Sequence, residues 1–148
     1  MGSKSTIIDE REMGELVHRC HKYLLDNRRI LGKYTYTELC KICNGIGPES
    51  WPKWITKTIS EVNPSAKLAS LIHDVECYES EKKPGTKLEF RQSNIRFFIN
   101  TCKAALGRYR WYDPRILLAA LSGLRFKFML DIFGKRAYKI RRTKTDER

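Results

Sequence analysis

Three helix-start signals divide this chain of 148 residues into segments with helical apolar spacing. Each signal places a capping residue just before a proline in the first turn, where the missing backbone N–H costs nothing. They are Ser50-Trp51-Pro52, Asn63-Pro64 and Asp113-Pro114. Apolar residues recur three and four positions apart in most of the segments between them, and no strand pattern competes. The sequence therefore predicts an all-α fold, a compact bundle of four to six helices.

One glycine-containing stretch, Cys43-Asn44-Gly45-Ile46-Gly47-Pro48, interrupts the helical pattern and predicts a long irregular loop. No repeat or shift in composition marks a domain boundary before Gly134, which ends the last helical segment. We therefore expect a single helical domain over residues 1–134. Residues 135–148 contain seven basic and two acidic residues, and we expect them to form a basic C-terminal arm.

The formal net charge of +12 favours anionic partners, either a phospholipid surface or nucleic acid. The first residues contain no apolar segment of the length found in export signals. No run of about eighteen apolar residues is present, so contact with a membrane should be peripheral rather than integral. Five unevenly spaced cysteines without an export signal indicate a reducing compartment rather than a disulfide framework.

His73 and Asp74 are adjacent ionisable residues within an apolar run, 68–78, that has helical spacing. Burying both costs free energy unless a metal, a partner or a catalytic task stabilises them. Asp74 is an oxygen ligand of the kind that calcium prefers, and a glycine loop can supply backbone carbonyls. Those carbonyls would come from Cys43, Gly45 and Gly47. With His73 as general base, these groups are the parts of a calcium-assisted esterase.

A downstream segment offers a partner for His73. Phe90, Asn94, Phe97 and Thr101 share one face of a helix that we expect over about 87–106. Because the phenylalanines belong in the core, Asn94 should also point inward. It could then reach His73 on the preceding helix, and we expect it to orient the histidine ring.

The order of these motifs resembles the phospholipase A2 superfamily. The matching pieces are the Gly45-x-Gly47 loop, His73-Asp74, Tyr78 and Ser93-Asn94-Ile95-Arg96-Phe97-Phe98. They also resemble an uncharacterised phage and prophage family, whose Ser-Ile-Pro-Arg-Trp stretch corresponds to Ser50-Trp51-Pro52-Lys53-Trp54 here. The resemblance covers about residues 43–98. It implies a viral lipid hydrolase, found in a virion or the host cytoplasm, with His73 as base, Asp74 as calcium ligand and Asn94 as the orienting group.

Two positions depart from the family pattern. Asn94 stands where the family has the aspartate that orients the histidine, and an amide cannot stabilise an imidazolium as a carboxylate does. Cys77 stands where the family has a tyrosine, with Tyr78 one place later. The resemblance is therefore compatible with a degenerate protein of weak or lost activity.

A second interpretation uses the cysteines. Cys40-Lys41-Ile42-Cys43, followed by Gly-x-Gly, resembles one repeat of the cysteine-rich region of DnaJ-type chaperones. His73 and Cys77 lie four residues apart on one helix face and could complete a four-ligand zinc site with Cys40 and Cys43. The chain would then be a zinc-stabilised basic module that binds nucleic acid or protein.

A third interpretation needs neither a catalytic site nor a metal site. His73 would be a neutral core histidine bonded to a backbone carbonyl, and Asp74 would pair with an arginine. Isolated cysteines are common core residues. The chain would then be a basic virion or accessory protein.

The segment Arg108-Tyr109-Arg110-Trp111-Tyr112 alternates guanidinium groups with aromatic rings. Such a surface could meet lipid head groups or stack nucleic-acid bases, but we interpret it first as a helix connection whose rings cover the core. The stripe Leu117, Leu121, Leu124 and Phe128 is likewise interpreted as core. The candidate lipid- or nucleic-acid-binding residues are Arg108, Arg110, Trp111, Lys135, Arg136, Arg141 and Arg142.

Overall fold

The computed structural model describes residues 8–45, 64–134 and 138–140, and the structural statements below concern those residues. Its elements are α1 (Glu10–Lys22), the 3-10 helix η1 (Arg28–Lys33), α2 (Tyr36–Gly45), α4 (Pro64–Lys82), α5 (Lys87–Arg108) and α6 (Pro114–Phe133). The described residues contain no strand, and their one extended pairing is an isolated bridge between Gly85 and Ile140. The prediction of an all-α fold is confirmed.

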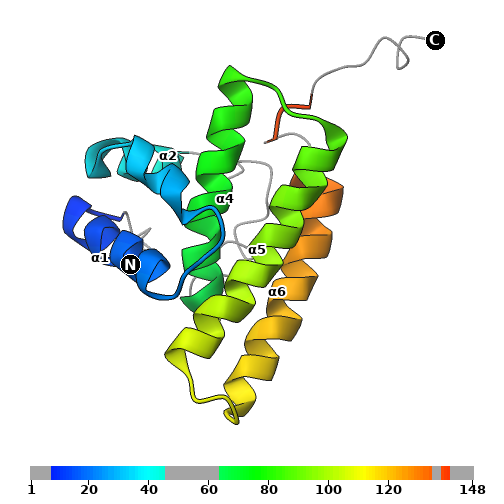
Figure 1. Ribbon diagram of the computed structural model, residues 1–148. Helices are drawn as coiled ribbons and strands as arrows, with labels where there is room; N and C mark the ends of the chain where they lie inside the picture. Colours follow the sequence, from blue (N-terminus) through cyan, green and yellow to red (C-terminus); the bar gives the residue numbers. More distant parts are fainter. Residues whose placement is uncertain (1–7, 46–63, 135–137, 141–148) are drawn as a thin grey trace, which may run out of the picture.

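The three long helices α4, α5 and α6 run antiparallel to one another in chain order and form the body of the molecule (Figure 1). Short connections join α4 to α5 and α5 to α6, which is the geometry of successive helix hairpins. The shorter helices α1 and α2 lie on the side of α4 that faces away from α6 (Figure 1). α4 is therefore the central helix, and its residues meet neighbours on several sides.

Helix ends follow the capping chemistry of the sequence. Asp113 accepts a hydrogen bond from the Arg115 backbone N–H at 2.9 Å, and Pro114 occupies the first turn of α6. Thr86 and Glu89 form a capping box at the start of α5, with the Glu89 N–H donating to the Thr86 hydroxyl at 3.1 Å. The predicted start at Asp113-Pro114 is confirmed. α4 begins at Pro64, as predicted, whereas Ser50-Trp51-Pro52 lies outside the described residues.

Two larger apolar clusters, and a smaller one around Tyr138, hold the helices together. The first joins α1, η1 and α2 to α4 and includes Met13, Leu16, Val17, Cys20, Leu39, Ile42, Leu68, Leu71, Ile72 and Val75. The second joins α4, α5 and α6 through Ala66, Ala69, Phe97, Phe126 and Leu130. α4 contributes to both clusters, and two of its ionisable residues, His73 and Glu76, are buried.

α6 buries a different face from the one that we predicted. The stripe Leu117, Leu121, Leu124 and Phe128 is 63, 52, 37 and 55% exposed, so its interpretation as core is wrong. Ala119, Gly123, Phe126 and Leu130 are buried instead. The physical reason is close packing: a Cβ added at Gly123 would lie 3.0 Å from Thr101 Cγ2 of α5, so the small residue lets the helices approach.

The connection between α5 and α6 also differs from its prediction. Trp111 and Tyr112 are 84 and 62% exposed, so the aromatic rings of this segment do not jointly cover the core. Arg108 and Arg110 are exposed beside them. Farther on, Tyr138 is buried against Phe90, so the packed part of the chain includes residues 138–140 beyond the boundary that we expected at 134.

Candidate functional site

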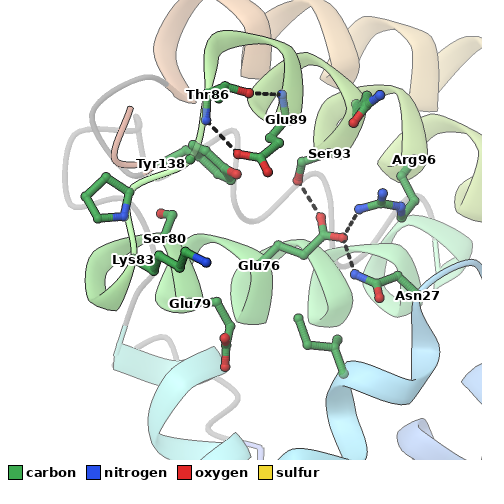
Figure 2. Close-up of a pocket in the computed structure, with 14 residues that line it drawn as sticks. Asn27, Glu76, Glu79, Ser80, Lys83, Thr86, Glu89, Ser93, Arg96 and Tyr138 are labelled. Carbon is green, nitrogen blue, oxygen red and sulfur yellow. Dashed lines mark hydrogen bonds and ion pairs between the residues drawn. The ribbon is translucent and has the colours of Figure 1, made fainter. Parts of the chain in front are cut away.

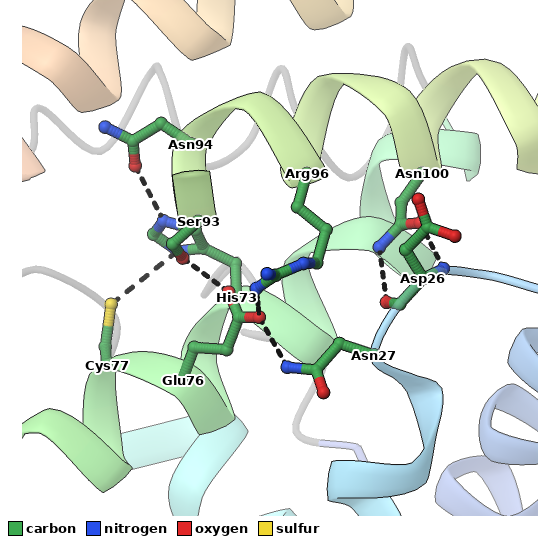
Figure 3. Close-up of polar contacts among 9 residues, drawn as sticks. All are labelled: Asp26, Asn27, His73, Glu76, Cys77, Ser93, Asn94, Arg96 and Asn100. Carbon is green, nitrogen blue, oxygen red and sulfur yellow. Dashed lines mark hydrogen bonds and ion pairs between the residues drawn. The ribbon is translucent and has the colours of Figure 1, made fainter. Parts of the chain in front are cut away.

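His73 of α4 and Asn94 of α5 meet in the interior between the two antiparallel helices. His73 Nε2 lies 3.1 Å from Asn94 Oδ1 (Figure 3). Asn94 is fully buried, and His73 is 6% exposed. The contact that helical periodicity led us to expect between these two side chains is present.

Asn94 also bonds a carboxylate on a third helix, α6. Its Nδ2 donates to Asp131 Oδ1 at 2.8 Å. Because a carboxylate accepts hydrogen bonds and an amide nitrogen donates them, this contact sets the orientation of the Asn94 amide. Asn94 Oδ1 therefore accepts from His73, and the proton of the neutral His73 ring sits on Nε2. His73 Nδ1 is left as a proton acceptor.

Sequence reasoning missed Asp131 and its partner Lys127. Lys127 Nζ lies 2.7 Å from Asp131 Oδ2, one helical turn apart on α6. The available signal was an oppositely charged pair at i, i+4 within an otherwise apolar helix. What the sequence could not indicate is that this pair faces Asn94, because the contact depends on how α6 packs on α5.

Cys77 lies at the other nitrogen of the His73 ring. Its Sγ is 3.7 Å from His73 Nδ1, one turn farther along α4 (Figure 3). Burial raises the pKa of the Cys77 thiol, so the sulfur keeps its proton and donates it to Nδ1. The thiol thus occupies the position at which a water molecule would approach the base.

His73 is neutral at physiological pH in this environment. Burial lowers the pKa of the imidazole, and the positive charge of Arg96 lowers it further. The nearby Glu76 charge and the hydrogen bond to Asn94 act in the opposite direction. The ring also contacts Phe97 edge to face, with 5.9 Å between ring centroids. A neutral imidazole with a fixed Nε2–H can accept a proton at Nδ1.

The free energy of unfolding should fall at acid pH because folded His73 resists protonation. The unfolded chain takes up this proton near pH 6.5, whereas burial holds the pKa of folded His73 lower. The contribution of neutral His73 is therefore present above about pH 6.5 and is lost as the pH falls toward the folded pKa. Urea unfolding at about pH 7.5 and about pH 5 should show a larger loss in wild type than in His73→Gln.

His18→Gln supplies the control for this comparison, because it makes the same chemical change at an exposed histidine outside the contact with Asn94. Asp74 acts in the opposite direction, because its raised pKa gives stability that is lost as the pH rises. Wild type, His73→Gln and His18→Gln all contain Asp74, so its effect cancels in the comparison. Equal pH dependence in wild type and His73→Gln would contradict the neutral, buried state of His73.

Asp74 directly follows His73 on α4. It is half-buried, and burial raises the pKa of its carboxyl well above the usual value. The Asp74 charge contributes, after burial, to the raised pKa of two thiols, Cys43 near the end of α2 and Cys77 on α4. Adjacent residues on a helix are about 100° apart, so Asp74 does not share the direction in which His73 meets Asn94 of α5.

Asp74 is the predicted calcium ligand that offers a side-chain oxygen. The described residues supply no hydrogen bond or ion pair to this carboxylate, so the interpretation that pairs it with an arginine finds no partner there. The last carbonyls of a helix such as α2 lack partners within the helix and carry the negative end of its dipole. Calcium binding by Asp74 together with such carbonyls therefore stays a prediction.

The other predicted metal ligands are not assembled in the part of the chain that is described. There, no group of three or more His, Cys, Asp or Glu residues is placed to hold a metal ion. Gly45 ends α2, and Gly47 lies outside the described residues. Of the alternative zinc ligands, Cys77 contacts His73. The zinc site with Cys40 stays a prediction.

A second polar cluster, centred on Glu76, lies one turn from His73 on α4. Glu76 is 8% exposed and accepts hydrogen bonds from Ser93, Arg96 and Asn27, the last at 2.7 Å (Figure 3). It borders a cavity of about 540 Å³ (Figure 2). Neither His73 nor Cys77 is among the described residues that line this cavity. The cluster joins the loop after α1 to α4 and α5, and sequence reasoning missed it.

The candidate surface residues are only partly described. Arg108, Arg110 and Trp111 are exposed at the end of α5 and in the following turn. Lys135, Arg136, Arg141 and Arg142 lie outside the described residues. None of the described helices is long and apolar enough to cross a membrane. Comparisons with protein-family models, curated proteins and solved structures gave no significant match.

Proposed function

We propose that this protein is a phospholipase A2-like ester hydrolase that uses His73 as a general base with calcium assistance. The observation that carries the proposal is the hydrogen bond between His73 Nε2 and Asn94 Oδ1 across two antiparallel helices. It fixes the ring and directs the basic nitrogen, Nδ1, away from Asn94. General-base catalysis requires this combination of a neutral ring, a fixed tautomer and an accepting nitrogen.

Asp131 partly compensates for the weaker stabilisation of a protonated His73 by the Asn94 amide than by a carboxylate. When His73 accepts a proton, the positive charge is stabilised by the Asn94 carbonyl and, one bond farther, by the Asp131 carboxylate. Lys127 offsets part of that negative charge. The stabilisation is weaker than direct contact with a carboxylate would give, so we expect slow turnover.

In the proposed reaction, His73 Nδ1 takes a proton from water while the water oxygen attacks the ester carbonyl. The proton then passes to the departing alkoxide, which gives a fatty acid and an alcohol. The Cys77 thiol must first turn away from Nδ1 to admit the water molecule. This displacement is a second reason to expect a low rate.

Asp74, with the backbone carbonyls of Cys43, Gly45 and Gly47, would hold the calcium ion. When bound, calcium would supply polarisation of the ester carbonyl and stabilisation of the oxyanion. Support for this role comes from the half-buried Asp74 carboxylate, which the described residues leave without a cationic partner.

Removing calcium or the Asp74 charge should abolish hydrolysis. Wild-type protein is incubated with phospholipid vesicles in calcium and in excess EGTA, and released fatty acid is measured. We expect calcium-dependent release by wild type and a rate at least about 100-fold lower for Asp74→Asn, because one charged ligand is lost. Asp26→Asn is the matched control, since Asp26 forms a partly exposed ion pair with Lys103. Release that persists in EGTA, or in Asp74→Asn, would contradict the proposal.

A further inference from the structure

The outward face of α6 is apolar along the whole helix. Its exposed large side chains are Leu117, Leu118, Leu121, Leu124, Phe128, Ile132 and Phe133. Since its buried face is also made of apolar and small residues, α6 has apolar side chains on both faces, although it also carries Arg115, Arg125, Lys127 and Asp131. Figure 1 shows α6 at the edge of the bundle, with α5 on its inner side. An apolar face of this length on an outer helix indicates an interaction surface.

The charges on this face are cationic or already paired. Arg125 is exposed among the apolar residues. Arg115 is exposed and is offset by Asp113, with 2.6 Å between Arg115 Nη2 and Asp113 Oδ2. Asp131, the other acidic residue of α6, is paired with Lys127. The described part of the face therefore presents apolar side chains and positive charge, without an unpaired acidic group.

Exposed aromatic and basic groups lie where α5 turns into α6. Trp111 and Tyr112 project from this turn with their rings in contact, and Arg110 Nη1 donates to the Tyr112 hydroxyl at 2.9 Å. Arg108 is exposed at the end of α5. Tryptophan and tyrosine prefer the boundary between head groups and hydrocarbon, and arginine side chains reach phosphates from the same depth.

We infer that the outward face of α6, together with Trp111, docks onto the surface of an anionic phospholipid bilayer, with the helix lying in the plane of the interface. A second copy of this chain fits less well, because two faces that each carry positive charge would meet without acidic residues to pair with them. The net charge of +12 also favours an anionic surface. Binding of this kind combines burial of apolar side chains with electrostatic attraction, and it does not depend on whether His73 catalyses a reaction.

Vesicle co-sedimentation in EGTA tests the inference without calcium-dependent hydrolysis. Wild-type protein is mixed with vesicles of phosphatidylcholine alone or with added phosphatidylserine. We expect binding to the anionic vesicles that weakens as salt is raised. Leu121→Gln and Phe128→Gln should each lower the partition coefficient roughly tenfold, because each removes one inserted apolar side chain.

Leu24→Gln is the matched control, since Leu24 is 62% exposed, similar to Leu121 and Phe128, and lies beyond the end of α1 rather than on α6. It should bind as wild type does. Circular dichroism and sedimentation velocity show whether each variant is folded and monomeric. Absence of binding to anionic vesicles, or wild-type binding by Leu121→Gln and Phe128→Gln, would overturn the inference. So would a wild-type dimer that these two substitutions dissociate, since a second copy would then occupy the face.

Discussion

Replacing Glu76 with glutamine should lower the free energy of unfolding by about 3 kcal/mol, because it leaves Arg96 without its buried counter-ion. Glu76 accepts from three donors at once, Ser93, Arg96 and Asn27. A glutamine has one oxygen for these donors and turns an N–H₂ group toward one of them. The Arg96 side chain is 30% exposed and can reach water, so the loss should lie at the lower end of the range for a broken buried pair. Urea denaturation monitored by circular dichroism measures it.

Glu15→Gln provides the control, because it makes the same chemical change in an ion pair on the surface. The side chains of Arg11 and Glu15 are 90 and 59% exposed, so their interaction is screened by water. The expected change in the free energy of unfolding is within about 0.5 kcal/mol. If Glu76→Gln were no more destabilising than Glu15→Gln, the Glu76 cluster would not be a structural link between the loop after α1 and helices α4 and α5.

Where local chemistry decides the structure, the sequence was a sufficient guide. Asp113 and Pro114 predicted the start of α6 because a side-chain cap and a proline act within one turn. The contact between Asn94 and His73 could be expected because Phe90 and Phe97 mark the buried side of α5. In both examples, the deciding interactions are repeated along one helix or fixed by a few neighbouring residues.

Where packing between helices determines which residues are buried or in contact, the sequence alone was not sufficient to predict them. α6 has apolar residues on both faces, so periodicity could not distinguish its inner side, and the close approach at Gly123 made the choice. Asp131 reaches Asn94 only because α6 packs against α5 in that register.

Replacing His73 with glutamine should lower the rate of fatty-acid release by at least about 100-fold, because general-base catalysis typically contributes that much or more. A glutamine side chain can still bond Asn94, so the packing between α4 and α5 should largely survive. It has no nitrogen that accepts a proton at neutral pH. The loss should therefore appear in kcat, with the circular dichroism spectrum unchanged and vesicle binding retained.

Cys77→Ala separates the two groups that could start the reaction. Cys77 Sγ lies 3.7 Å from His73 Nδ1, so the substitution removes the thiol that occupies the position of the attacking water. If His73 is the base, Cys77→Ala should release fatty acid at the wild-type rate or faster. If the thiol itself were the nucleophile, this substitution would abolish release.

The most direct test of the proposed function is the initial rate of calcium-dependent fatty-acid release from phospholipid vesicles by wild type, His73→Gln and Cys77→Ala, with His18→Gln as the exposed-histidine control. The proposal predicts release by wild type, Cys77→Ala and His18→Gln, and none above background by His73→Gln. Hydrolysis by folded His73→Gln at the wild-type rate, or no calcium-dependent release by wild type, would contradict it.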